Sequence, residues 1–492
     1  MQKITRILPL VFLLLATEMS LFAQVNDRRE LTLERCIRLA QRQSPEANIA
    51  RKTFESAYWS FKSFRAGLLP QVRLDADLPG LVRSFIPNTL DDGSITFSSQ
   101  NVASSSATLS INQTFAPTGA SIYLRSRLNR QDVFGTNAST IYRSTPFVVG
   151  VRQPLFGYNS LRWDRQIQPL QYTLAEKRYL ESLEDIAIDI TGKYFDIYIA
   201  EIRLVNALTN ASINDSIFTI AKGRFNVGKI AENDLLQTEL AYLNAIAAER
   251  QAEVALEKAQ TELAISLGMS DPRSIGVRPP LDIPQVEIDA DFALAQAREN
   301  RSDMVDYQVR GLEAESNVAR VRSENRFNAN ILAEFGLNQV GNTLTEVYSN
   351  PQDQQTATVG IGIPLLQWGR GKAAVESALI SQDRIREQIK LDNRRLERDV
   401  RFQVLDFLQL QQQTRLSAKA DTIAQRRYEV AKNRYLIGKI DITNLQIAQT
   451  EKDNARSTYI QALKQFWVAY YRLRRSTLYD FIEDALIVTP EF

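Results

Sequence analysis

The 492-residue sequence predicts an α+β membrane protein made of two tandem repeats, each combining a β-hairpin with a long α-helical hairpin. Three observations predict this fold. Segments of the first half recur in the second half, long stretches carry a heptad pattern, and shorter stretches alternate apolar and polar residues. We expect the β-hairpins to contribute to a barrel shared by several chains and the coiled-coil hairpins to form an elongated helical body.

The internal repeat is clearest in two short phrases. RFNVGKI begins at Arg224 and RYLIGKI begins at Arg434, which is an offset of 210. VGVRQPLF and VGIGIPLL keep the same offset, whereas an earlier match of Ser44 with Ser302 has an offset of 258, so the first copy carries 48 extra residues. We therefore expect a first repeat at 24–275 and a second at 276–492, joined by a Pro-rich connector.

Residues 1–23 are predicted to be a signal peptide. A basic start with Lys3 and Arg6 precedes an apolar core from Ile7 to Ala16, and Ala23 is a small residue at the expected cleavage point. The core is too short to span a membrane as a helix, which takes about 20 residues. The mature chain is expected to work outside the cytoplasm.

The strand regions alternate with a period of two. Val149 and Val151 share one face while Arg152 lies on the other, and Val359 and Ile361 share a face in the second repeat. Such alternation is typical of a membrane barrel with a watery lumen, and also of a soluble sheet with one wet face. The combination with export and long helices favours the barrel.

The number of strands implies that the barrel is shared. At most six strand candidates are found in the chain, whereas the smallest membrane barrels have about 8 strands. Beyond the signal, no apolar run approaches the length of a spanning helix. Because an open sheet edge cannot sit in lipid, several chains are expected to close one barrel together.

Each strand region is followed by a very long helix and a return helix. In the first repeat, apolar residues stand seven apart at Leu183, Ile190, Ile197, Leu204, Ala211, Phe218 and Phe225. The second long helix is expected from about Gly371 to Leu436. About 65 residues at 1.5 Å each make a rod of roughly 100 Å. Gly228 and Gly438 close these helices, because a left-handed residue lets the chain turn back.

Taken in order, these segments resemble the TolC-like outer-membrane factors, the outer membrane efflux protein family. The resemblance covers nearly the whole mature chain and rests on LTLERCIRLAQRQSPEA, LLPQVRLDADL, VGVRQPLF, VGIGIPLL, FNVGKI and YLIGKI. It implies a homotrimer with a barrel of about 12 strands in the outer membrane of a Gram-negative cell and a helical tunnel across the periplasm. It also implies outer-membrane lipid, a periplasmic adaptor (membrane fusion) protein and an inner-membrane transporter as partners.

The resemblance also implies a gate at the hairpin tips, near 226–234 and 436–444. In the family, inward-curled hairpins held by polar contacts shut the tunnel at its periplasmic end. Asp234 stands where the acid of the first hairpin is expected, and Tyr435 where a tip tyrosine joins the closing hydrogen bonds. Asn444 is a departure, because that position is often acidic in the family, and Asp441 offers a nearby charge instead.

A group of tip residues is expected to contact the adaptor. The group consists of Gly228, Lys229, Gly438, Lys439 and Asp441. The alternative for Lys229, Lys439 and Asp441 is a solvated charge beside a helix cap.

Composition excludes several other functions. The chain has no His and one Cys, which removes the usual zinc sites and His-based or Cys/His catalysis. The 59 basic and 57 acidic residues nearly cancel, so no nucleic-acid partner is expected. The segment around Lys372 lacks the Ser or Thr of a phosphate loop. We expect no enzyme activity, no cofactor and no metal.

Three functional classes remain open. The first is an export duct for small solutes, working with a pump. The second is the same duct serving type I protein secretion, and the third is a periplasmic coiled-coil scaffold without a pore. The extra residues of the first repeat, at about 100–145, are predicted to add a pair of strands and a Gly/Asn-rich loop, with a role that the sequence leaves undetermined.

Overall fold

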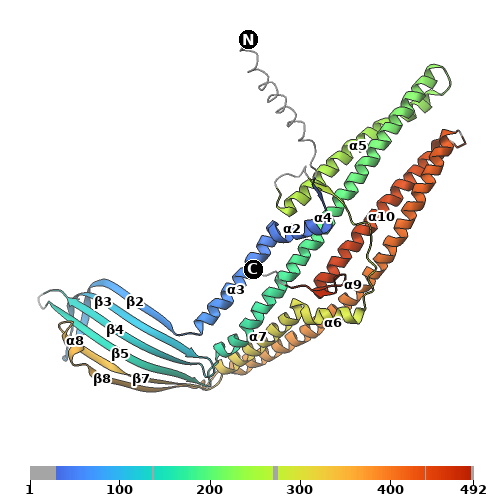
Figure 1. Cartoon of the computed structure of the whole chain (residues 1–492). Coiled ribbons are helices and arrows are strands. Elements are labelled where there is room, and N and C mark those ends of the chain that lie inside the picture. The colour runs from blue at the N-terminus through green and yellow to red at the C-terminus, as the bar shows by residue number, and fades with distance from the viewer. Residues whose placement is uncertain (1–28, 136–137, 270–274, 438, 441, 489–492) are drawn as a thin grey trace, which may run out of the picture. The chain divides into compact units, whose positions relative to one another are not determined.

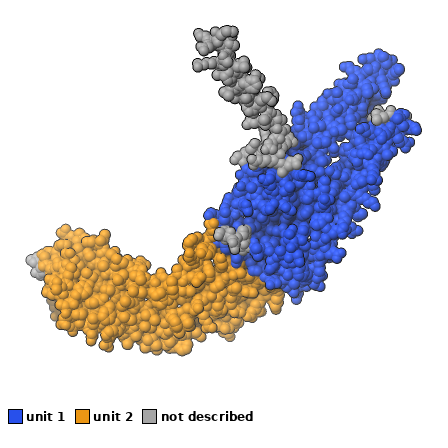
Figure 2. Space-filling view, in the orientation of Figure 1, with its two compact units in different colours: residues 1–54, 176–302, 394–492 blue, residues 55–175, 303–393 orange. Residues whose placement is uncertain are grey.

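The computed structural model describes residues 29–135, 138–269, 275–437, 439–440 and 442–488. The predicted signal peptide lies outside these ranges. The chain divides into two compact units, shown in two colours in Figure 2. Unit 1 comprises residues 1–54, 176–302 and 394–492, and unit 2 comprises residues 55–175 and 303–393.

The described part of unit 2 contains a six-stranded antiparallel sheet in the order β2-β3-β4-β5-β7-β8 (Figure 1). Its strands are β2 (Gln71–Thr89), β3 (Ile95–Phe115), β4 (Ala120–Val133), β5 (Ser139–Leu155), β7 (Asn328–Gly341) and β8 (Gln352–Gly362). The alternating pattern of the sequence explains the two faces of the sheet, since successive side chains of a strand point to opposite sides. The short helix α8 (Glu346–Ser349) lies between β7 and β8 in the chain.

The first repeat contributes four strands of this six-stranded sheet and the second contributes two. Helix α3 (Pro45–Gly67) leads into β2 as α7 (Ser302–Glu324) leads into β7, and β5 leads into the next helix as β8 does. By position in the repeat, β3 and β4 are therefore the added strands predicted within 100–145. They lie between β2 and β5 in the sheet, so they are inserted as interior strands and not added at an edge.

The long helices repeat with the predicted offset. Helices α4 (Ser160–Asn226) and α9 (Arg370–Leu436) have 67 residues each, and both of their ends differ by 210. The return helices α5 (Glu232–Leu267) and α10 (Ile442–Thr477) have 36 residues each at the same offset. Among the described residues, no helix combines the length and the apolar character needed to cross a membrane.

The offset predicted for the start of the repeats is wrong by one residue. Helices α2 (Leu33–Gln43) and α6 (Ala290–Asn300) differ by 257 at both ends, as do α3 and α7. Ser44 caps the C-terminus of α2, whereas Ser302 is the first residue of α7. The two residues are both serine, but they do not occupy structurally equivalent positions.

The heptad seam of α4 is buried around Ile190 and Ile197 and becomes exposed toward the C-terminal end of the helix. Ile190 and Ile197 are almost completely inaccessible, whereas Phe225 is 37% exposed. Phe218 stacks on Tyr242 of α5, with ring centroids 5.8 Å apart. At Phe218, the seam therefore packs α4 against its return helix, as a coiled coil does.

The starts of the two repeats are joined in unit 1. Strand β1 (Arg29–Leu31) pairs in parallel with β6 (Ile275–Val277). The hydroxyl of Tyr194 on α4 donates to the carbonyl oxygen of Leu31 over 2.8 Å. At the C-terminal end, β9 (Tyr479–Asp480) and β10 (Ala485–Leu486) form a small hairpin after α10.

Candidate functional site: the hairpin tips and the helix junction

The first tip ends α4 with a left-handed glycine. Gly228 has φ of 69°, its N–H donates to the carbonyl of Phe225 over 2.8 Å, and the N–H of Lys229 donates to Arg224 over 2.9 Å. These two bonds form the Schellman pattern that closes helices. A Cβ at Gly228 would meet no described atom within 4 Å, so backbone conformation and not space requires the glycine here.

The second tip repeats the same closing bond. The N–H of Lys439 donates to the carbonyl of Arg434 over 2.9 Å, which is the bond between Lys229 and Arg224 shifted by 210. Of the other predicted residues, Gly438 and Asp441 lie outside the described residues, as does the side chain of Tyr435. Both tips lie at the same end of unit 1 (Figure 1).

Four of the predicted tip residues lie exposed. Lys229 and Asp234 are exposed at the first tip, and Lys439 and Asn444 at the second. Asp234 lies in the first turn of α5, where the helix dipole favours an acid. Ala231, the N-cap residue, makes no side-chain capping bond, so the acids of this turn supply the complementary charge. The first tip thus presents a lysine and an acid to solvent on either side of the turn.

Further along the hairpins, α10 is joined to α4 by polar side chains. Lys464 donates to Asp196 over 2.6 Å, and Arg456 donates to the hydroxyl of Tyr198 over 3.1 Å. The remaining pairs are Arg475 with Asp185 at 2.9 Å and Gln449 with Asn210. The second repeat's return helix therefore packs along the first repeat's long helix.

Arg456 connects three helices. Besides Tyr198 on α4, it pairs with Asp421 on α9 over 2.9 Å. Burial by itself would lower the pKa of Arg456, but the hydrogen bonds to Asp421 and Tyr198 outweigh burial and raise it. Its positive charge is therefore permanent, and the junction is a fixed electrostatic link between α4, α9 and α10.

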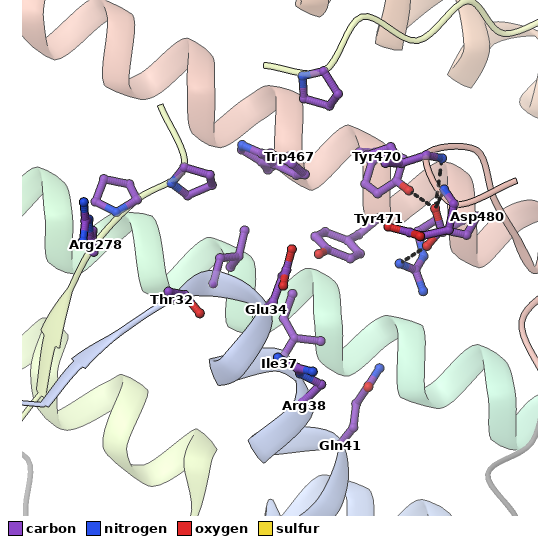
Figure 3. A pocket seen from close by; sticks show the side chains of 17 residues that line it. Thr32, Glu34, Ile37, Arg38, Gln41, Arg278, Trp467, Tyr470, Tyr471 and Asp480 are labelled. Atoms are coloured by element: carbon purple, nitrogen blue, oxygen red, sulfur yellow. Dashed lines mark hydrogen bonds and ion pairs between the residues drawn. The ribbon is translucent and has the colours of Figure 1, made fainter. Parts of the chain in front are cut away.

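A pocket of about 690 Å³ lies elsewhere in unit 1, between α2, the connector around Arg278 and α10. Figure 3 shows Trp467 and Tyr471 on one side of it and Glu34 and Arg38 of α2 opposite. Within its wall, Arg474 donates to Asp480 over 2.7 Å, and the hydroxyl of Tyr470 also donates to Asp480.

The acids that contact Arg474 have opposite pKa shifts. Burial raises the pKa of Glu184, despite its 3.0 Å bond from Arg474, and one of its oxygens has no hydrogen-bond partner among the described residues. Burial alone would raise the pKa of Asp480 too, but the bonds from Tyr470 and Arg474 hold it below its usual value. The charges at this wall bind one another, which makes it a structural junction.

Comparison with known proteins decides the family. The model described as outer membrane efflux protein matches residues 100–269 and 293–477, well over half of the chain. Each matched stretch contains one long helix and its return helix. The chain belongs to this family.

Solved structures show the same fold for the efflux protein. The Campylobacter jejuni CmeC outer membrane channel has a TM-score of 0.65 at 14% identity, with 90% of this chain and 85% of that chain covered. The outer membrane protein VceC from Vibrio cholerae has a TM-score of 0.62 at 13% identity, with 90% and 95% covered. The open state of the Neisseria gonorrhoeae MtrE outer membrane channel has a TM-score of 0.62 at 14% identity, with 93% and 91% covered. A comparison with curated protein sequences finds no match.

The sequence predicted the positions of the two tips, but it did not predict the link that Arg456 makes between α4, α9 and α10. The glycines and their lysines marked the turns, whereas Arg456, Lys464 and Tyr198 carry no local signal of their role. Asp196, the partner of Lys464, recurs at Asp406 with the offset of 210, which marks that part of α4 as repeated and no more. In the described part of the chain, no group of three or more His, Cys, Asp or Glu side chains could hold a metal ion.

Proposed function

We propose that three copies of this efflux protein form a channel-tunnel, the exit duct of a tripartite efflux system with a periplasmic adaptor and an inner-membrane pump. The sheets contribute to one barrel in the outer membrane, and the helical hairpins form the tunnel wall in the periplasm. Each chain supplies two repeats, 24–275 and 276–492, so that six repeats surround the tunnel.

The observation that carries this proposal is a pair of exposed apolar seams. On α9, Phe402, Leu405, Leu416, Ile423 and Val430 follow a heptad spacing and are each more than half exposed. On α5, Leu236, Leu240, Leu243, Val254 and Ile265 are also more than half exposed and share one helix face. Seams of this length indicate that another helix covers them.

The internal repeat supports a second copy as the partner. Within the chain, α10 packs along α4 through the bonds of Lys464 and Arg456. The counterpart of α10 in the first repeat is α5, 210 residues earlier, and the counterpart of α4 in the second repeat is α9, 210 residues later. The α5 seam of one copy is therefore expected to pack on the α9 seam of the next, and the family resemblance supplies the number three.

The tips are the proposed gate. Their exposed lysines and the acid at Asp234 form the surface that an adaptor would contact. By the family resemblance, adaptor binding at the tips would uncurl the hairpins by breaking the polar contacts that the resemblance assigns to Asp234 and Tyr435. Replacing Asp234 with Ala and Tyr435 with Phe should raise single-channel conductance in planar bilayers. Unchanged conductance from an intact trimer would remove both residues from the gate.

The seams test the assembly separately. Leu416→Glu places a charge in the α9 seam, so we expect detergent-extracted protein to lose its trimer mass while keeping its helical circular dichroism. Gln425→Glu is the matched control, because Gln425 is exposed on the opposite side of α9. A Leu416→Glu protein that remains trimeric would contradict the proposed packing of the seams.

A further inference from the structure

The sheet has a continuous apolar face that reaches its edge strand. Val72 on β2 lies opposite Ile111 on β3, which lies opposite Leu124 on β4. The same row continues through Val149 on β5 to Phe335 on β7. Val72 is 65% exposed and Phe335 is 49% exposed, and Leu124 and Val149 are exposed as well, so these four side chains of the row face solvent in the described chain.

Neighbouring rows repeat this composition across all six described strands. Their apolar members include Leu74 and Leu109, Ile122 and Val151, and Ile331 and Val359, each pair in register between adjacent strands. All six of these side chains are exposed. We call this set and the row above it the apolar belt, and it has the character of a lipid-facing surface.

The opposite face carries polar groups that bind one another. The hydroxyl of Tyr123 on β4 donates to Glu334 on β7, and Arg125 donates to the same carboxylate over 3.2 Å. A soluble sheet would bury its apolar face and expose the polar one. Here the apolar belt is open and the polar face is partly shielded, which is the arrangement of a barrel wall with a polar interior.

The added strands β3 and β4 cannot be left out of that wall. They lie between β2 and β5, which correspond by position to β7 and β8 of the second repeat. If β2 and β5 belong to the barrel, the strands hydrogen-bonded between them do as well. The apolar belt crosses β3 and β4 without a break.

The two edges of the sheet fit each other. All neighbouring strands are antiparallel, so the first and the last of the six run in opposite directions. Strand β8 of one copy can therefore pair antiparallel with β2 of the next. Such pairing removes both open edges, whose unpaired backbone groups lipid does not tolerate.

We infer that each copy places all six strands in the shared barrel, so that three copies close 18 strands instead of about 12, with β8 of one copy paired to β2 of the next. This inference rests on the trimer of the proposed function. Because barrel diameter grows roughly in proportion to strand number, the barrel would be roughly 1.5 times as wide as a 12-stranded one.

Disulfide cross-linking tests the inference. The only cysteine, Cys36, is buried and is first replaced with Ala. Cysteine is then placed on β2, at Leu74 or Ala76, and on β8, at Ala357 or Val359. After oxidation in isolated outer membranes, we expect disulfide-linked dimers and trimers on non-reducing gels, because paired strands lie about 4.8 Å apart.

The matched control moves the first cysteine to Leu124 or Ser126 on β4. In an 18-stranded barrel β4 lies three strands, about 14 Å, from β8 of either copy, which is too far for a disulfide. A trimer that links β4 to β8, or that links no β2–β8 pair, would overturn the inference and leave the proposed function intact. A mass that is not trimeric would overturn both.

Discussion

Lys464 on α10 donates a hydrogen bond to Asp196 on α4 over 2.6 Å, and this bond joins the return helix of the second repeat to the long helix of the first. Arg456 makes a neighbouring link, in which the side chain of its partner Asp421 is only 16% exposed, against 50% for Asp196. Solvent screens the first pair more than the second. The two links are therefore expected to differ in strength.

Arg456→Met should destabilise the efflux protein clearly, because it leaves Asp421 shielded without its cation. We expect a loss of about 1–3 kcal/mol, seen as a lower midpoint of thermal unfolding in detergent. Lys464→Met is the matched control, with an expected loss of about 0–1 kcal/mol. Equal midpoints for the two variants would contradict a special role of Arg456 in joining α4, α9 and α10.

Asp480→Asn should lower the thermal midpoint at pH 7 and have less effect in acid. The folded-state pKa of Asp480 is lowered, so its carboxylate stabilises the fold above the unfolded pKa of about 3.9, and this contribution is lost as the pH falls through the folded pKa. The difference between variant and parent midpoints should shrink below about pH 4. Glu483→Gln, at an exposed acid of the same segment, is the control. A difference that does not depend on pH would argue against this charge as the cause.

Gly228→Ala should loosen the first tip, since Ala in the left-handed region costs about 1–2 kcal/mol. Gly223→Ala, five residues earlier and inside α4, should be neutral or slightly stabilising because its Cβ meets no described atom. Hydrogen exchange of the amides of residues 224–234 measures the difference. Equal exchange in the two variants would show that the turn does not depend on the left-handed glycine.

Gly150→Ala should disturb the sheet, because the Tyr123 ring lies over Gly150 and would overlap an added methyl group. Gly80→Ala is the matched control, since the nearest atom to its Cβ would be a carbonyl oxygen 4.0 Å away. We expect the assembled protein to dissociate at a lower temperature on gels in the first variant only. Because Tyr123→Ser also removes the bond to Glu334, the double variant is compared with Tyr123→Ser alone: Gly150→Ala should add little further loss there, and an undiminished loss would exclude the ring overlap as the cause.

Much of the fold could be predicted from the sequence because its signals are local and occur twice. The heptad spacing and the tip glycines predicted α4, α9 and their return helices, and the alternating segments predicted strands. The contacts of Lys464 and Arg475 could not be predicted, because their partners lie 268 and 290 residues away. A single sequence does not show which long helices are neighbours. The sequence match of Ser44 with Ser302 gives an offset that is one residue too large. Serine occurs at both positions, although Ser44 caps α2 and Ser302 begins α7.

The proposed trimer is tested most directly by electron microscopy of the detergent-extracted protein, with its mass in solution measured alongside. We predict a threefold particle of three chains that carries a helical rod of roughly 100 Å, the length that helices of 67 residues provide. A monomer, or a dimer that stays in the aqueous phase without detergent, would contradict a shared barrel and favour a periplasmic scaffold.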